Sequence, residues 1–191
     1  MKDKSPKNKK NSSSSILTSK SQIWIETVIY TLIALSIIGL LLAFLKPAID
    51  EKKDKLIIEQ SQTMLSEIEK QIDDVRFYGT GNSRTLNIAI KKGELTVDGD
   101  SDQVFFMMRS KYQLSESGEN ITIGNLNITT IQKGREYEIT LLLNYANKGI
   151  NITFEGEDKI QTLPPTTSPY KISVSNQGRV NELQEISFVR F

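Results

Sequence analysis

Residues 23–45 read IWIETVIYTLIALSIIGLLLAFL, an apolar stretch of 23 residues whose only charged side chain is Glu26. As a helix rising about 1.5 Å per residue, this stretch reaches about 34 Å, enough to span the roughly 30 Å hydrocarbon core of a bilayer. A secretory signal has a shorter apolar region, of about 7–15 residues, and ends at a small-x-small cleavage site. This stretch closes instead with Leu45-Lys46-Pro47, so we expect the helix to be retained as a membrane segment.

The residues before the apolar stretch are strongly basic. Residues 1–21 hold six lysines against Asp3 alone, a net charge of +5, whereas the whole chain carries only +1. This part has no Arg and no aromatic residue and contains a run of four serines at 12–15, which is typical of a solvated tail and disfavours a nucleic-acid partner. The positive-inside rule then predicts a cytoplasmic amino terminus and residues 46–191 outside. A residue such as Ser115 should be accessible there.

Glu26 is the unusual residue of the membrane segment. A carboxylate at the centre of a membrane helix costs about 2.5–3.5 kcal/mol, and less near the helix end. One interpretation therefore places Glu26 at the lipid headgroups. The other starts from Lys20-Ser21-Gln22, which precedes it: cleavage after Ser21 would make Gln22 the first residue and Glu26 the fifth, so that an ammonium and a carboxylate share one apolar layer.

Lys20, Ser21, Gln22 and Glu26, followed by the apolar helix, resemble archaeal type IV pilin-like proteins with class III signal peptides. In that family a basic leader ends in Lys or Arg and a small residue, and the mature chain commonly starts with Gln and has Glu at its fifth position. Ser21 stands where Gly or Ala is usual, and Trp24 where Ser is frequent. The resemblance implies removal of residues 1–21 by a prepilin peptidase, and assembly with copies of itself or other pilins through the helix.

The sequence after Pro47 predicts that the helix continues as an amphipathic one. Apolar residues recur at spacings of three, four and seven, the period of one helix face. This stripe consists of Ile57, Met64, Leu65, Ile68, Ile72 and Val75. We expect Pro47 to bend the helix and Gly79 or Gly81 to end it. The stripe does not distinguish a pilin from a simple membrane anchor, because in both classes the apolar face of the helix would pack against the protein's own C-terminal domain.

From residue 84 onward the apolar period changes to two, which predicts strands. Eight short strands are expected, at about 86–90, 95–97, 104–108, 120–123, 136–145, 150–154, 170–175 and 185–189. Predicted turns lie at 98–100, 118–120, 133–135, 147–149 and 176–178, and a surface loop at 164–169. The predicted fold class is α+β: a long hydrophobic N-terminal helix at 22–78, after the leader 1–21, and an antiparallel β-sheet or sandwich head at 79–191.

Composition excludes several kinds of chemistry. The chain has no Cys and no His, which excludes disulfides, zinc sites of the Cys/His kind and imidazole-dependent triads. Residues 168–171 formally match S-x-x-K, but Pro169 disfavours the helical turn which that pair needs. We therefore expect neither an enzyme nor a cofactor.

Two kinds of residue remain as candidate sites in the head. Asp98, Asp100 and Asp102 are spaced like the start of a calcium loop, but the bidentate acid expected eleven residues after the first falls on Arg109, which leaves a weak metal candidate against a solvated turn. The sequons at Asn120, Asn127 and Asn151, each followed by Ile-Thr, are candidates for N-glycosylation. In each sequon Asn and Thr share one strand face, so a polar outer face is expected with or without a glycan.

Together these features predict a structural subunit of a type IV pilus-like surface filament or secretion pseudopilus. The precursor would lie in the cell membrane and the mature subunit in a surface filament, with adhesion as one possible role. The alternative is a single-pass, membrane-anchored β-domain outside the cytoplasm that binds a ligand or a glycan.

Overall fold

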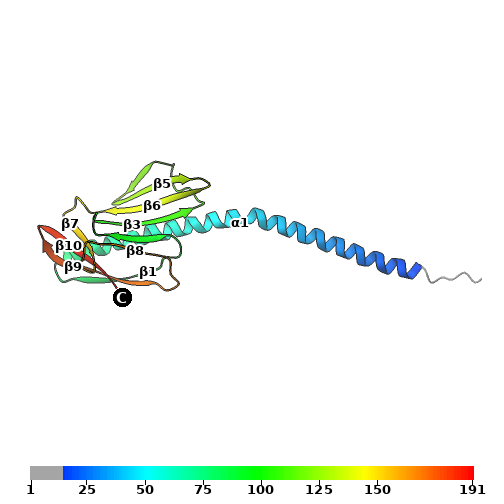
Figure 1. Cartoon of the computed structure of the whole chain (residues 1–191), viewed down its shortest axis with the longest axis horizontal. Helices are drawn as coiled ribbons and strands as arrows, with labels where there is room; N and C mark the ends of the chain where they lie inside the picture. Colours follow the sequence, from blue (N-terminus) through cyan, green and yellow to red (C-terminus); the bar gives the residue numbers. More distant parts are fainter. Residues whose placement is uncertain (1–14) are drawn as a thin grey trace, which may run out of the picture. The chain divides into compact units, whose positions relative to one another are not determined.

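The structure, a computed structural model, describes residues 15–191, with side chains described from residue 23 onward (Figure 1). Its first element is the 64-residue helix α1 (Ser15–Tyr78), which contains Pro47. The chain divides into two compact units, Met1–Ala48 and Ile49–Phe191. The boundary between these units lies within α1, because the second part of the helix packs with the strands, whereas the predicted division into a helix at 22–78 and a head at 79–191 follows the secondary structure. We call residues 23–48 the apolar half of α1, residues 49–78 its amphipathic half, and residues 49–191 the head unit.

The apolar half of α1 is uncovered along its whole length. Every side chain from residue 23 to residue 48 is exposed, including large ones such as Trp24 and Phe44. The helix is long and apolar enough to cross a membrane. The predicted hydrophobic helix is thus confirmed, and its surface is compatible with membrane anchoring.

The head unit combines the amphipathic half of α1 with ten strands in two sheets. The strands are β1 (Ser83–Ile88), β2 (Glu94–Asp98), β3 (Gln103–Ser110), β4 (Asn120–Ile123), β5 (Leu126–Lys133), β6 (Glu136–Asn144), β7 (Ile150–Phe154), β8 (Ile160–Leu163), β9 (Tyr170–Val180) and β10 (Leu183–Arg190). One sheet has the order β1-β9-β10-β7 and the other β4-β5-β6-β3-β2-β8. All neighbours are antiparallel except β7 and β10. The α+β prediction is confirmed.

Two strands and one turn differ from the expectation. Strands β5 and β8 were not predicted, because a second Asn- and Thr-rich segment and a four-residue edge strand have weak apolar alternation. The turn predicted at 176–178 is wrong: β9 continues through it, and Gln177 is the extra residue of a β-bulge opposite Glu185 and Ile186. The chain reverses instead at Asn181-Glu182, whose positive φ angles of 50° and 71° are those of a type I′ turn.

The amphipathic half of α1 supplies one side of the core. Its buried positions follow spacings of four and three and are Asp54, Ile58, Ser61, Leu65, Ile68, Ile72 and Val75. The apolar ones among these side chains join one apolar cluster with residues from both sheets, such as Phe106 and Phe188. Ile57 and Met64, which were predicted in the stripe, lie at its half-buried border. The helix ends where expected, since Gly79 follows Tyr78 with a φ of 88°.

Candidate functional site

Glu26, the one carboxylate of the apolar half, has a partner on its own helix. The hydroxyl of Tyr30 donates a hydrogen bond to Glu26 Oε1 at 3.1 Å, one helical turn further on. Sequence reasoning named only the amino group of Gln22 as a partner, although the spacing of four residues could have indicated Tyr30. The side chains of Lys20, Ser21 and Gln22 lie outside the described residues, so cleavage after Ser21 and pairing with Gln22 stay predictions.

The threonine and serine hydroxyls of the apolar half are hydrogen-bonded to the helix backbone. Thr27 donates to the carbonyl of Ile23 at 2.9 Å, and Ser36 donates to that of Leu32 at 2.7 Å. Thr31 does the same within its own turn. Hydroxyls bonded in this way tolerate an apolar environment, so Glu26 is the one charged group that the described residues from 23 to 45 present to lipid or to another helix.

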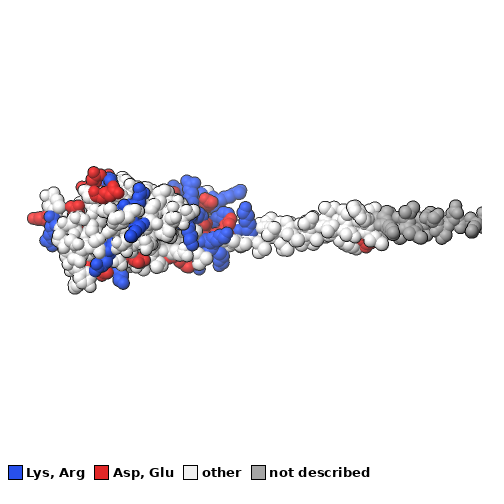
Figure 2. Space-filling view, turned by 90° about the horizontal axis from the view of Figure 1, so that it is seen from below, with Lys and Arg blue, Asp and Glu red and all other residues white. Residues whose placement is uncertain are grey.

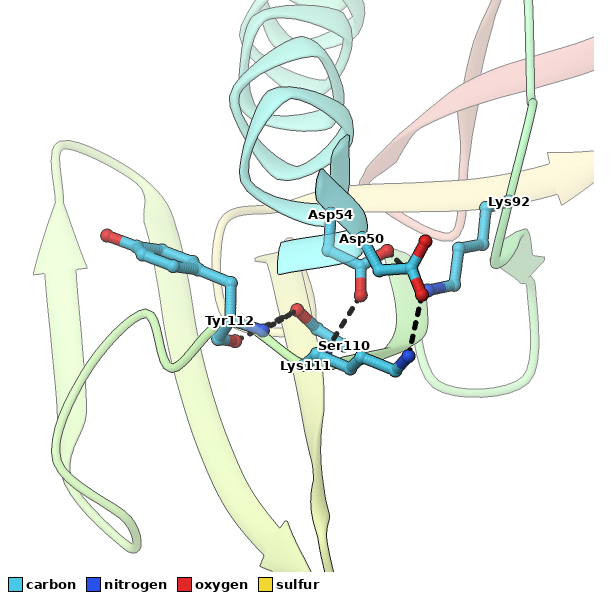
Figure 3. Close-up of polar contacts among 6 residues, drawn as sticks. All are labelled: Asp50, Asp54, Lys92, Ser110, Lys111 and Tyr112. Carbon is cyan, nitrogen blue, oxygen red and sulfur yellow. Dashed lines mark hydrogen bonds and ion pairs between the residues drawn. The ribbon is translucent and has the colours of Figure 1, made fainter. Parts of the chain in front are cut away.

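A polar cluster fastens the start of the amphipathic half to the strands (Figure 3). Asp54 is buried, with 4% of its surface exposed, and it accepts hydrogen bonds from the Lys92 ammonium and from the backbone N–H of Lys111, the latter at 2.8 Å. Asp50 accepts a second bond from Lys111, at 2.7 Å from its Nζ. This bond raises the pKa of the Lys111 ammonium. Lys92 precedes β2 and Lys111 follows β3, so the cluster joins three separate segments.

Two of the three aspartates of the weak metal candidate are engaged within the head unit in other ways. Asp98 accepts a hydrogen bond from the backbone N–H of Ser101 at 3.1 Å, which closes the turn between β2 and β3. Asp102 accepts one from the N–H of Ile152 at 2.8 Å and so ties that turn to β7. Burial raises the pKa of the Asp102 carboxyl. In the described part of the chain no three acidic side chains, Asp100 included, are placed to hold a metal ion.

Two of the three sequons face each other across a hairpin. Strands β4 and β5 pair Asn120 with Thr129 and Thr122 with Asn127. Each threonine hydroxyl donates to the asparagine carbonyl oxygen of the other sequon, at 2.7 Å and 2.9 Å. Asn120 is exposed and Asn127 half-buried. The predicted sharing of one face is confirmed for this pair, and glycan attachment stays a prediction.

The third sequon and the S-x-x-K match lie elsewhere in the head unit. Asn151 is half-buried on β7 and donates to Asp158 at 3.2 Å. Ser168 lies in the loop before β9, whereas Lys171 lies on β9 with its ammonium 5.9 Å from the ring centre of Phe191. No helical turn brings Ser168 and Lys171 to one face, so this motif does not form a nucleophile and base.

The head unit also has an open groove of about 610 Å³ between the outer face of α1 and the β4–β5 hairpin. Seven of its nine lining residues are polar and lie on the helix, among them Gln62, Ser66 and Lys70, and Ile123 and Leu126 of the hairpin complete the lining. The lining includes no histidine or cysteine, and its two carboxylates, Glu67 and Glu69, lie two residues apart on α1 and therefore do not face each other. Nothing about the groove indicates a catalytic centre.

Comparisons of the chain with protein-family models, with curated proteins and with solved structures gave no match. The function is therefore inferred from the residues described above. Among them, the pair Glu26–Tyr30 on an uncovered apolar helix is the feature that the head unit does not explain, since neither residue contributes to its core.

Proposed function

We propose that this protein is a structural subunit of a type IV pilus-like surface filament or secretion pseudopilus. The observation that carries the proposal is Glu26. It is the one carboxylate of the apolar half of α1, whose described side chains are all exposed. A helix that served only as an anchor would gain nothing from this charge, because a carboxylate in an apolar layer costs free energy. In a filament subunit, by contrast, the Glu26 carboxylate can fix the axial position of the helix among the helices of other subunits.

The proposed mechanism begins with the precursor in the membrane. While the helix lies in lipid, the hydroxyl of Tyr30 offsets part of the desolvation cost of Glu26. After cleavage behind Ser21, the new ammonium of Gln22, on the same chain or on the next subunit, pairs with that carboxylate. Such a pair offsets the cost far better than a neutral hydroxyl and sets the axial register of the incoming helix. The remaining apolar side chains exchange lipid for other helices, and the head units cover the outside.

The competing function is the membrane-anchored β-domain that binds a ligand or a glycan. It requires the same apolar helix but neither Glu26 nor a cut after Ser21. Mass analysis of the amino terminus in the surface fraction separates the two: a chain starting at Gln22 supports the filament subunit, and one starting at Met1 supports the anchor. Ser21→Phe should accumulate a precursor 21 residues longer, whereas Ser21→Ala should be cut normally, because a pocket for a small side chain excludes only the phenyl ring.

Glu26→Leu tests the assembly step itself. We expect this variant to be inserted and cut, since neither step needs the charge, but to be lost from purified filaments. Tyr30→Phe keeps the carboxylate and should weaken incorporation less. Thr31→Val is the matched control, because the Thr31 hydroxyl bonds only its own helix backbone. Normal amounts of Glu26→Leu in filaments would return the protein to the anchor class.

The predicted orientation has its own test. Ser115, the labelling site expected from the sequence, is unsuitable because it is only 9% exposed and donates a hydrogen bond to Thr130. The neighbouring Glu116 is exposed. Because the chain has no cysteine, Glu116→Cys provides a unique site for a membrane-impermeant thiol reagent. Intact cells should be labelled; labelling that appears only after lysis would reverse the orientation.

A further inference from the structure

Lysine side chains gather at the end of the head unit where the amphipathic half of α1 begins (Figure 2). We call this group the lysine collar, and it consists of Lys52, Lys53, Lys55, Lys91, Lys92 and Lys111. Three come from α1 and three from the segments after β1 and β3. The contacts of Lys92 with Asp54 and of Lys111 with Asp50 hold these segments against the helix, and Lys91 borders the same small hollow as Ile57.

The collar has more positive charge than its own acids can neutralise. Asp50 and Asp54 are engaged by Lys111 and Lys92, and Glu51 is the third acid of the first helical turns. Lys55 pairs with Glu59 at 3.9 Å, so six lysines face four carboxylates. Lys52, Lys53 and Lys91 form no ion pair with any residue of the part that the structure describes. Their ammonium groups are free to bind an anion from outside the chain.

The position of the collar along the chain restricts what that anion is. Lys52 follows Leu45, the last residue of the apolar stretch, by seven residues, which is about 10 Å of helix. The polar headgroup layer on each side of a bilayer is about 5–8 Å thick. Whatever direction the head unit takes, a membrane around the apolar half thus brings its headgroups within reach of Lys52 and Lys53, since long lysine side chains extend towards the interface.

We propose that the lysine collar binds the anionic phosphate headgroups of the lipids that surround the apolar half, on the membrane face that carries the head unit. A lysine ammonium is a flexible point charge that suits phosphate. Each lysine near an anionic membrane surface strengthens binding by about fivefold. Ion pairs engage Lys55, Lys92 and Lys111 and leave Lys52, Lys53 and Lys91 for lipid. The proposal needs only that the apolar half spans a membrane, and it holds for a filament precursor and for an anchor alike.

Site-resolved acylation of lysines tests this directly in the full chain. The protein is placed in nanodiscs of phosphatidylcholine alone, or with about one third phosphatidylglycerol, and is treated with a water-soluble acylating reagent before peptide mass analysis. We expect Lys52, Lys53 and Lys91 to react about fivefold more slowly in the anionic discs. Lys148 and Lys159, on the segments after β6 and β7, are internal controls and should react equally in both. Equal rates for the collar in the two lipids would overturn the proposal.

Two further arms separate lipid binding from binding of free phosphate and from a general surface effect. Inorganic phosphate added to phosphatidylcholine discs should give no protection, and protection equal to that by the anionic lipid would assign the collar to free phosphate. In the variant Lys52→Gln/Lys53→Gln the protection of Lys91 should fall below about twofold, whereas Lys148→Gln/Lys159→Gln should leave it unchanged. Unaltered protection of Lys91 in the collar variant would show a general surface effect, not a binding site. If the collar lysines were protected from acylation only when a second protein is present, the collar would be a protein contact and the lipid assignment would be overturned.

Discussion

The two halves of α1 are equally helical, but the apolar side chains are buried in one half and exposed in the other. In the amphipathic half, apolar residues at spacings of three and four are buried against the strands, with Ile68, Ile72 and Val75 at most 1% exposed. In the apolar half, Ile37 is 53% and Leu41 54% exposed, and no described part of the chain covers them. The amphipathic half therefore stabilises the protein's own core. The other presents a surface that needs lipid or further helices.

The largest effect is expected from removing a core side chain of the amphipathic half. Ile72→Ala should lower the free energy of unfolding of the head unit by about 2–5 kcal/mol, through lost burial and the cavity left behind. Denaturant unfolding of the full chain in detergent, followed by near-UV circular dichroism, measures the change. Ile37→Ala is the matched control in the apolar half and should change it by less than about 0.5 kcal/mol. Equal losses in both variants would contradict the division of α1.

A smaller effect is expected from the cluster that fastens the amphipathic half. Asp54→Ala leaves the Lys111 N–H and the Lys92 ammonium without their acceptor, which should cost about 2 kcal/mol. Glu51→Ala, an exposed acid on the same turns, should cost less than about 0.5 kcal/mol. The same unfolding measurement applies, and a loss at Glu51 as large as that at Asp54 would show that general charge, not the buried contact, matters.

The contrast between covered and uncovered positions extends to the carboxylates of the β2–β3 turn. Because burial raises the pKa of Asp102 in the folded state, its ionised form opposes folding, and stability falls as pH rises from the unfolded value of about 3.9 through the folded one. Asp102→Asn keeps an oxygen acceptor for the Ile152 N–H and removes the charge. At pH 7 it should match or exceed the wild-type stability by up to about 1 kcal/mol.

The difference between wild type and Asp102→Asn should shrink when unfolding is measured near pH 3.5. Asp100→Asn, at an exposed position of the same turn, is the control and should have no comparable pH dependence. If the stability gained by Asp102→Asn increased towards acid pH, the conclusion that folding raises the pKa of Asp102 would be contradicted.

The smallest effect concerns a buried hydroxyl that faces the amphipathic half. Tyr145 is 1% exposed, its hydroxyl has no hydrogen-bond partner among the described residues, and burial, with the charges of Glu69 and Asp73, raises its pKa. Tyr145→Phe removes an unsatisfied polar atom and should leave stability unchanged or raise it by about 0.5 kcal/mol. Tyr170→Phe, which loses a 2.9 Å bond to the Pro164 carbonyl, should lower it by about 1 kcal/mol. Thermal unfolding of the two variants gives the comparison.

Features that depend on near neighbours in the chain were predictable. The helix, its end at Gly79 and most strands follow from apolar spacing and turn residues, which act over a few positions. The bulge at Gln177 was not predictable in this way. Asn176 lies in the strand because its side-chain amide donates to the carbonyl of Val75 at the end of α1, a contact between residues 101 positions apart. This buried hydrogen bond outweighs the local turn propensity of residues 176–178.

The apolar helix, its lone carboxylate, the amphipathic continuation and the β-rich head all follow from the amino-acid sequence, because helical and strand periods and the cost of a charge in an apolar layer are local properties. Three features became visible only in the folded chain: the unit boundary inside α1, the two sequons that face each other on β4 and β5, and the collar of lysines from three segments. Each of these depends on which distant segments pack together, and the free energy of that packing is shared over the whole core instead of being encoded in any one stretch.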